Sequence, residues 1–390
     1  MIGRTNAIDG GSSIEIPLDA PTNFAAAGGN AQVSLTWTDP ADKYATSSGE
    51  TSESGDQLVS EWDYTRIVRK AGSQPTGPND GTPVVEVSTR NQYQSSPYVD
   101  SGVQNDTTYH YAAYAYNKEG VVSKGAFTTA TPQSYSPVLN DNTWEQIKGV
   151  AAGGAAGSVW AVGDRKEIVL NGTISKLSLS NYSVCVFILG FNHNASLEGN
   201  NTIHFQIGKT ALTGGKDICM MSGFNDDSDF YMNTSNTNSG GWKNSYMRNN
   251  ILGTSVSSYS GTFIGALPAD LRAVLKPVQK YTNNTGESSS QSAVTATTDY
   301  MFLLGEPEVF GSTTYANSYE ANYQEQYTYY ASGNSKVKYR HDSTGSAAYW
   351  WERSPYASNS NSFCFVISNG FANYDYATFS RGVAPAFAVG

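Results

Sequence analysis

A stretch of alternating residues from Val103 to Gly120 restricts the fold of this chain more than any other feature. Successive side chains of a β-strand point to opposite faces of a sheet, so residues two apart share a face. The positions that a strand would turn to one face are Val103, Thr107, Tyr109, Tyr111, Ala113, Ala115 and Asn117. We therefore predict a strand here, with His110 on its outward face.

Shorter runs of the same kind occur between residues 20 and 132, separated by turn residues. Residues 33–37 (VSLTW) alternate cleanly, and residues 64–72 and 82–89 are two further candidate strands. Short strands with turn residues between them are typical of a β-sandwich. We expect an N-terminal β-sandwich over residues 18–133, preceded by a Gly/Ser-rich tail or attachment segment over residues 1–17.

The second half of the chain mixes helix and strand patterns. Thr143 is a suitable N-cap for a helix that runs to the glycines at 153 and 154. Strands are predicted for residues 167–172 and 184–191, and the second is apolar on both faces and therefore central. Further helices are expected within residues 241–252 and 268–275, and further strands within residues 349–355, 363–370 and 382–389. The fold class we predict is mainly β with an α+β part over residues 143–390, joined to the sandwich by a linker over residues 134–142.

The charge balance argues against nucleic acid as a partner. Charged residues make up only 15% of the chain, and 34 acidic against 24 basic residues give a net charge of -10. Binding to a phosphate backbone depends on clustered Lys and Arg side chains. We expect no nucleic-acid partner.

Neither a disulfide scaffold nor a membrane segment is indicated. Cys185, Cys219 and Cys364 are too few and too scattered for such a scaffold and are expected to be buried apolar side chains. The first residues lack the apolar core of a secretion signal, and the longest apolar stretch, residues 184–191, is far short of the roughly 18 residues that cross a bilayer. No membrane insertion is expected, and delivery on a particle such as a phage tail would need neither signal nor disulfides.

The sequence contains no strong motif for a metal or for catalysis. Gly153, Gly154 and Gly157 are not followed by the GK[ST] of a phosphate-binding loop. The close-set Asp226, Asp227 and Asp229 would suit calcium, but without the glycine and distal glutamate of an EF-hand a solvated turn is favoured. The four histidines are His110, His193, His204 and His341. No two of them have the sequence spacing of a metal-ligand pair. We expect no metal, cofactor or catalytic residue, although a carboxylate pair for glycoside hydrolysis has no sequence signature and stays open.

The C-terminal segment has a composition unlike the rest of the chain. Its flanks, residues 349–355 and 381–387, are rich in Trp, Pro and small apolar residues, as in a packed framework. Between them Tyr, Ser, Asn, Phe and Asp crowd together without the period of a core element. Tyr and Phe supply rigid contact area, while Ser and Asn supply adaptable hydrogen bonds, as in antibody binding loops. We predict a ligand-binding surface in this segment.

The alternating stretch from Val103 to Gly120 resembles the fibronectin type III pattern. In that resemblance Tyr109 is the tyrosine-corner residue, Asn117 and Gly120 close the last hairpin, and Trp37 is the core tryptophan of the second strand. The proline usual in that family is replaced by Asn105. The resemblance implies a fibronectin III or immunoglobulin-like sandwich that acts as a spacer.

Residues 143–390 resemble C-type lectin-like domains that are related to the formylglycine-generating-enzyme fold and occur in phage and bacterial surface proteins. The stretches that carry the resemblance lie at residues 158–172, 187–194, 242–248, 267–278, 350–355 and 381–387. The resemblance implies a C-type lectin-like α+β domain with its ligand site in a variable region at about residues 350–390.

Some members of that family are targets of diversity-generating retroelements, which randomise adenines of a template. Randomised asparagine codons do not yield Trp, Lys, Gln, Glu or Met, and none of these occurs from Pro355 to Gly390. The framework is expected to include Phe363, Val366, Gly370 and Ala377. The resemblance implies a diversified binding face made of Tyr356, Ser358, Asn359, Ser360, Asn361, Ser362, Phe365, Ile367, Ser368, Phe371, Asn373, Tyr374, Asp375, Tyr376, Thr378 and Phe379.

These features predict a receptor-binding protein of a phage tail or bacterial surface, not an enzyme. Its partner would be a host cell-surface protein or glycan, its N-terminal region would anchor it to the particle, and a homotrimer would raise avidity. One alternative is an enzyme of the formylglycine-generating type, which needs a copper-binding cysteine pair that Cys185 and Cys364 would have to supply. The other is a structural phage or cell-wall component without a diversified site.

Overall fold

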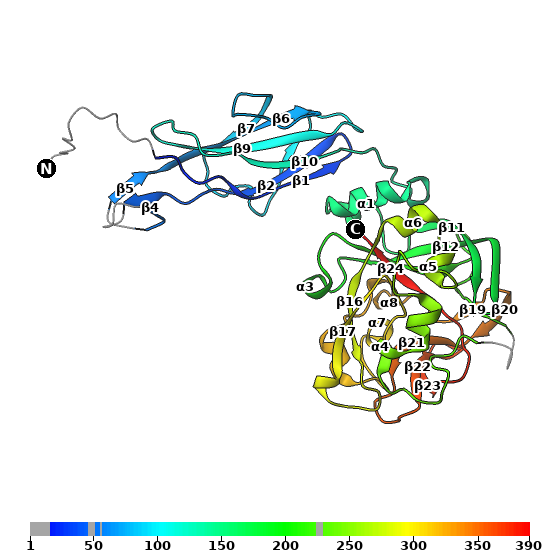
Figure 1. Ribbon diagram of the computed structural model, residues 1–390. Helices are drawn as coiled ribbons and strands as arrows, with labels where there is room; N and C mark the ends of the chain where they lie inside the picture. Colours follow the sequence, from blue (N-terminus) through cyan, green and yellow to red (C-terminus); the bar gives the residue numbers. More distant parts are fainter. Residues whose placement is uncertain (1–15, 46–50, 55–56, 224–228) are drawn as a thin grey trace, which may run out of the picture. The chain divides into compact units, whose positions relative to one another are not determined.

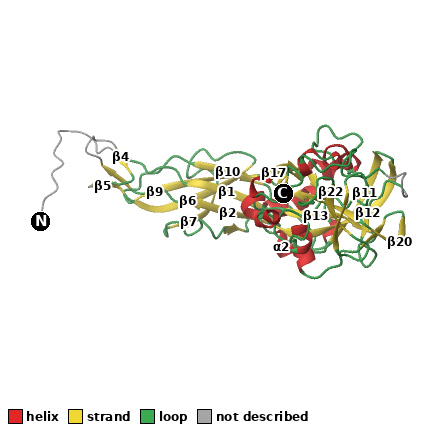
Figure 2. Cartoon of the chain, turned by 90° about the horizontal axis from the view of Figure 1, so that it is seen from below, coloured by secondary structure: helices red, strands yellow, loops and turns green. Residues whose placement is uncertain are grey.

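The computed structural model describes residues 16–45, 51–54, 57–223 and 229–390. The chain divides into two compact units, residues 1–134 and residues 135–390. Both are built mainly from antiparallel β-sheets, and within the described residues helices occur only in the second unit (Figure 1 and Figure 2). The expected tail over residues 1–17 lies almost entirely outside the described residues. No helix among the described residues is long and apolar enough to cross a membrane.

The first unit has two main sheets and one small sheet. One main sheet has the order β1-β2-β8 and the other β10-β9-β6-β7. Their strands are β1 (Thr22–Gly29), β2 (Gln32–Thr38), β6 (Trp62–Ala71), β7 (Thr82–Val87), β8 (Tyr98–Asp100), β9 (Tyr109–Asn117) and β10 (Ala126–Ala130). The small sheet joins β3 (Lys43–Ala45), β4 (Thr51–Ser52) and β5 (Gln57–Ser60). The strands expected at residues 33–37, 64–72, 82–89 and within 103–120 are confirmed.

The core of the first unit follows the predicted alternation. On β2, Val33, Leu35 and Trp37 are buried and the residues between them are partly exposed. Tyr111 and Ala113 of β9 join the same core, whereas Ala112 and Tyr114 belong to a separate cluster. At the start of β9 the hydroxyl of Tyr109 accepts a hydrogen bond from the backbone N–H of Gln104 at 3.1 Å. This contact ties the strand to the loop that precedes it.

The second unit begins earlier than the sequence predicts. Residues 134–142, expected to be a linker, include Leu139, which is buried in the core of the second unit. The indole N–H of Trp160 donates to the carbonyl of Ser136 at 3.1 Å. The prediction of a linker is therefore wrong for most of this segment, because an apolar side chain and a buried indole hold it against the unit that follows.

The first long helix of the second unit forms where the sequence predicts it. Helix α1 (Trp144–Ala152) begins at Thr143, whose hydroxyl accepts from the N–H of Gln146 while the Gln146 side chain accepts from the N–H of Thr143. This reciprocal capping satisfies two N–H groups that the first turn leaves unpaired. Trp144, Ile147 and Val150 then face the core.

A six-stranded sheet forms the body of the second unit. It contains β11 (Arg165–Ile174), β12 (Leu177–Phe191), β13 (Ile203–Lys209), β15 (Leu275–Lys276), β18 (Met301–Phe302) and β24 (Ala386–Val389). β12 lies between β11 and β13, and residues 184–190 are all buried, so the predicted central strand is confirmed. β24, the last strand of the chain, pairs with β13 on one side and with β15 and β18 on the other (Figure 1, red).

Short helices and small sheets surround this body. The expected helix over residues 241–252 is broken, because Ser245 is extended between α4 (Gly241–Asn244) and a π-helix (Met247–Leu252). The helix expected within residues 268–275 is α6 (Ala269–Ala273), which follows Pro268. The other helices are α2 (Ala156–Val159), α3 (Ala195–Glu198), α5 (Phe263–Ala266), α7 (Glu306–Phe310) and α8 (Thr328–Ala331), with 3-10 turns at Leu139–Asp141, Gln291–Ala293 and Ser318–Asn322. The small sheets join β14 (Ile218–Cys219), β19 (Lys338–Arg340) and β20 (Ser343–Ala348), and β16 (Val278–Asn283) and β17 (Val294–Asp299).

Candidate ligand-binding surface

The predicted binding segment folds into a three-stranded antiparallel sheet. Its strands are β21 (Trp350–Pro355), β22 (Ser362–Val366) and β23 (Ala372–Tyr376), with β22 in the middle and β23 at one edge. The register places Cys364 opposite Tyr374 and Phe365 opposite Asn373. Gly370 in the turn between β22 and β23 has φ +89°, a conformation that glycine adopts without strain. The sequence did not predict β23.

Most of the predicted binding residues reach the surface. Phe371 is 67% exposed, Tyr374 40%, Tyr376 45% and Phe379 44%. The partly or fully exposed positions also include Tyr356, Ser358, Asn359, Ser360, Asn361, Ile367, Ser368, Asn373, Asp375 and Thr378. Among the residues expected to form the framework, Phe363, Val366 and Ala377 are buried and Gly370 is partly exposed.

Two of the predicted binding residues are instead part of the interior. Ser362 is 1% exposed and Phe365 is 4% exposed. Both lie on β22, which has a neighbouring strand on each side, and the ring of Phe365 contacts Trp351 and Tyr349. Their assignment to the binding face is therefore wrong, because all five residues of β22 are buried and the rest of the second unit covers both faces of this strand.

Three tyrosines form one aromatic cluster at the edge of this sheet. The rings of Tyr356 and Tyr374 stack with centroids 4.2 Å apart. Tyr315 meets both rings edge-on, at 5.6 Å from Tyr356 and 5.1 Å from Tyr374. We call Tyr315, Tyr356 and Tyr374 the tyrosine cluster. Tyr315 is not among the predicted binding residues, because it lies outside the C-terminal segment and no local sequence pattern identifies it.

A buried carboxylate positions Tyr315. Glu306, at the start of α7, is fully buried and accepts hydrogen bonds from the backbone N–H groups of Thr314, Tyr315 and Ala316 at 3.0, 3.0 and 2.7 Å. Ala316 also forms a β-bridge with Tyr356. Burial raises the pKa of Glu306, although the three N–H groups act in the opposite direction. The loop that carries Tyr315 is thereby fixed to the core.

A buried amide holds the loop from Tyr356 to Ser362. The Nδ2 group of Asn238 donates to the backbone carbonyls of Tyr356, Asn359 and Ser362 at 3.2, 2.7 and 2.9 Å. Its backbone N–H donates to the carbonyl of Ser360 at 2.8 Å. One side chain from outside the segment therefore fixes the path of the exposed loop, whatever side chains that loop carries.

A cleft with a volume of about 720 Å³ opens beside the sheet. Its lining includes Ser368, Thr378 and Phe379 from the predicted binding segment, together with Tyr349 and Arg381 from the flanks. The guanidinium of Arg381 lies 5.3 Å from the ring centroid of Tyr349 and 5.4 Å from that of Phe379, and it pairs with Asp375. Residues from both the expected variable region and the expected framework thus form one cavity.

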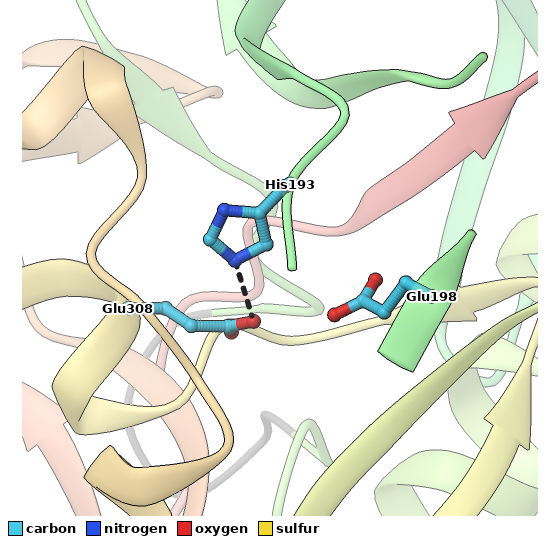
Figure 3. Close-up of side chains that lie close together, drawn as sticks. All are labelled: His193, Glu198 and Glu308. Carbon is cyan, nitrogen blue, oxygen red and sulfur yellow. Dashed lines mark ion pairs between the residues drawn. The ribbon is translucent and has the colours of Figure 1, made fainter. Parts of the chain in front are cut away.

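A second candidate site is a buried polar cluster in the body of the unit. His193 and Glu198 lie at the two ends of the short stretch that contains α3, Glu308 lies on α7, and each offers one ligand atom within 4.8 Å of the others (Figure 3). His193 Nε2 lies 3.5 Å from Glu308, and the ring of His204 lies 5.5 Å from that of His193. Two of the four histidines that look isolated in the sequence, His193 and His204, are therefore close together in the fold.

A lysine already occupies the cation position of this cluster. Lys280 Nζ lies 2.8 and 2.9 Å from the two oxygens of Glu198 and 3.1 Å from Glu308. Arg353 pairs with the other oxygen of Glu308, so two buried cations balance two buried carboxylates. Burial alone would raise the pKa of Glu308, but Arg353 and Lys280 hold that pKa well below its usual range. A divalent metal here would add charge that nothing compensates, so the cluster is best explained as a structural ion network.

The remaining sequence candidates that the structure describes do not form a site. Cys185 lies on β12 and Cys364 on β22, in different sheets, and burial raises the pKa of both thiols. All three cysteines are buried, as expected. Asp226 and Asp227 lie outside the described residues. Asp229 is buried and bonded to Ser175, so it is not part of a solvated turn.

Comparison with known proteins gives one family match. Residues 220–390 match the family described as a domain of unknown function (DUF6273). The match begins directly after β14 and covers the elements from α4 to β24, and with them the three-stranded sheet, the tyrosine cluster and the cleft. No curated protein matches the chain.

Proposed function

We propose that this chain is a recognition protein that binds its ligand through the exposed residues of the segment from Tyr356 to Phe379. The observation that carries the proposal is the clustering of exposed rings. Four of the seven large aromatic side chains that are exposed among the described residues lie between Phe371 and Phe379. Exposed aromatic side chains gathered in one patch are typical of binding surfaces, since each provides contact area at a low cost in conformational entropy.

The support beneath this surface favours a diversified site. The loop from Tyr356 to Ser362 is held by backbone carbonyls that bond to Asn238, and the loop of Tyr315 is held by backbone N–H groups that bond to Glu306. Backbone contacts do not depend on the side chains that the loop exposes. A protein whose binding residues are randomised by a diversity-generating retroelement needs a scaffold of this kind.

The same proposal extends to the fold families and to the setting of the protein. The bond from Gln104 to the hydroxyl of Tyr109 and the buried Trp37 support the resemblance of the first unit to fibronectin type III modules. A C-type lectin-like second unit would then be displayed on a phage tail or a bacterial surface. There a homotrimer would strengthen attachment to a host surface protein or glycan by avidity.

A display experiment tests the proposal without the natural ligand. A library of the full chain is randomised at Tyr356, Phe371, Tyr374, Tyr376 and Phe379 and selected for binding to lysozyme as a probe protein. A matched library is randomised at five exposed positions of β11 and β12, which are Glu167, Val169, Asn171, Thr173 and Ser178. We expect folded display from both libraries but binders from the first alone.

Two outcomes would contradict the proposal. Equal yields of binders from the two libraries would mean that the segment has no special capacity for recognition. Loss of folded protein from the first library would mean that its side chains are structural. In the source genome, a near-copy of the 3′ end of the gene beside a reverse transcriptase would give independent support for diversification.

A further inference from the structure

The cleft beside the three-stranded sheet is lined by two exposed aromatic side chains and, among the described residues, by arginines that are each paired with a carboxylate. Tyr349 and Phe379 are 42% and 44% exposed, and the guanidinium of Arg381 lies against both rings. Arg340, which also lines the cleft, forms a two-fold hydrogen-bonded pair with Asp342 at 2.9 and 2.7 Å. Each arginine in the lining is therefore neutralised by a carboxylate.

This chemistry selects among ligand classes. A neutral sugar ring has one apolar face of C–H groups, which packs on an aromatic ring, and a rim of hydroxyl groups, which need hydrogen-bond partners. Among the described residues the cleft offers aromatic rings, the hydroxyls of Ser368 and Thr378, and guanidinium groups that are each paired with a carboxylate. An anionic ligand would have to compete with Asp375 and Asp342 for the arginines. The volume of about 720 Å³ lies in the range of small-ligand sites, which is about 300–1,000 Å³.

We infer that this cleft is a binding site for neutral sugar rings of a glycan. The inference rests on the proposed function and deepens it, because it names the ligand class for one part of the surface. Tyr349, Arg340 and Arg381 lie outside the segment proposed to vary, whereas Ser368, Thr378 and Phe379 lie within it. The fixed half of the cleft sets the ligand class, and the variable half selects which glycan of that class binds.

The charge balance makes the specificity testable through one residue. Asp375 pairs with Arg381 and is itself a position of the variable segment. Asp375→Asn removes the carboxylate and leaves the guanidinium of Arg381 without its partner. A sugar with a carboxylate can then pair with Arg381, because guanidinium and carboxylate groups form strong charge-assisted hydrogen bonds.

The experiment measures binding of the full chain, presented in many copies on beads, to an array of defined neutral and acidic oligosaccharides. We expect the native chain to bind neutral oligosaccharides and Tyr349→Ala to lose about tenfold or more in apparent affinity. Asp375→Asn should shift binding toward acidic oligosaccharides. Tyr319→Ala, an exposed tyrosine outside both the cleft and the segment from Tyr356 to Phe379, is the matched control and should keep glycan binding. Melting curves of each variant establish that it is folded.

The result that overturns the inference is distinct from one that overturns the proposed function. If the native chain binds no oligosaccharide, or if Tyr349→Ala binds like the native chain while folded, the cleft is not a sugar site. If Asp375→Asn leaves the selectivity unchanged, the argument from charge fails. In each case the selection against lysozyme still decides whether the surface from Tyr356 to Phe379 is a recognition site.

Discussion

The ring of Tyr374 stacks on the ring of Tyr356 with centroids 4.2 Å apart, yet 40% of Tyr374 stays exposed. An aromatic pair adds about 0.5–1.5 kcal/mol beyond the area that it buries. This pair therefore contributes little to stability, while the exposed part of the ring remains available for contact. A ring that stabilised the fold would be covered, as that of Phe363 is on the neighbouring strand.

The first prediction compares these two rings. Tyr374→Ala should lower the free energy of unfolding by about 1 kcal/mol or less, because the side chain is partly solvated in the folded state. Phe363→Ala should lower it by about 3–5 kcal/mol, because it leaves a cavity in the interior. Urea denaturation of the two variants and the native chain measures the difference. Equal losses would show that Tyr374 is a structural residue.

The second prediction concerns Glu320, which accepts hydrogen bonds from Ser354 and from the N–H of Asn283 inside the fold. Burial raises the pKa of Glu320 to about 7. A raised pKa in the folded state means that the folded chain holds a proton that the unfolded chain releases at lower pH. The stability that depends on this proton is present below the unfolded pKa of about 4.5 and is lost as pH rises to about 7.

Comparison of Glu320→Gln with the native chain isolates this effect from other titrating groups. Burial lowers the pKa of His193 and His204. The contribution of these two histidines to stability therefore rises as pH increases toward their usual pKa, which is opposite to the contribution of Glu320. The difference in unfolding free energy, variant minus native, should rise between pH 4.5 and pH 7. Glu167→Gln, at an exposed position, controls for the loss of a carboxylate. A difference that does not change with pH would contradict the assignment.

The sequence predicts best where a local pattern has one physical solution. The alternation of Val33, Leu35 and Trp37 fixes one face of β2, and Thr143 with Gln146 fixes the start of α1. The exposure of Tyr374 and Tyr376 also follows from composition, since a core strand does not crowd Tyr with Asn and Asp.

Contacts between distant segments could not be predicted in this way. Tyr315 joins the tyrosine cluster only because Glu306 and the bridge from Ala316 to Tyr356 bring its loop there. Phe365 looks like its exposed neighbours in the sequence but is buried, because other parts of the second unit cover both faces of β22. Lys280 forms an ion pair with Glu198, which lies 82 residues away in the sequence, and no spacing rule predicts a contact at that separation.

The third prediction concerns the ion network of Lys280, Glu198 and Glu308. Because the ammonium of Lys280 is bonded to both carboxylates, neither a chelator nor added zinc should change the melting temperature of the native chain. Lys280→Met leaves the carboxylates without this partner and should destabilise the fold by about 3–5 kcal/mol. Calorimetry with EDTA and with Zn²⁺ measures the first effect and urea denaturation the second. A lower melting temperature with EDTA would show that the cluster holds a metal.

The last prediction concerns Asn238, whose Nδ2 group donates to three backbone carbonyls of the loop from Tyr356 to Ser362. Asn238→Asp keeps the shape of the side chain but replaces this donor with an oxygen that faces carbonyl oxygens. A buried group that loses its hydrogen bonds costs about 1–3 kcal/mol, and repulsion between the oxygens adds to the loss. We expect faster hydrogen exchange of the N–H groups in this loop.

An exposed asparagine of the C-terminal segment, Asn369, provides the control for this change. Asn369 is exposed at the turn between β22 and β23 and accepts the N–H of Phe371 at 3.2 Å, which an aspartate can also do. Asn369→Asp should therefore leave both stability and exchange nearly unchanged, although it introduces the same charge. If both variants behaved alike, the added charge would explain the effect, and Asn238 would not be the residue that holds the binding loop. If only Asn238→Asp loosens the loop, a buried side chain outside the proposed variable segment sets the shape of the surface that the segment displays.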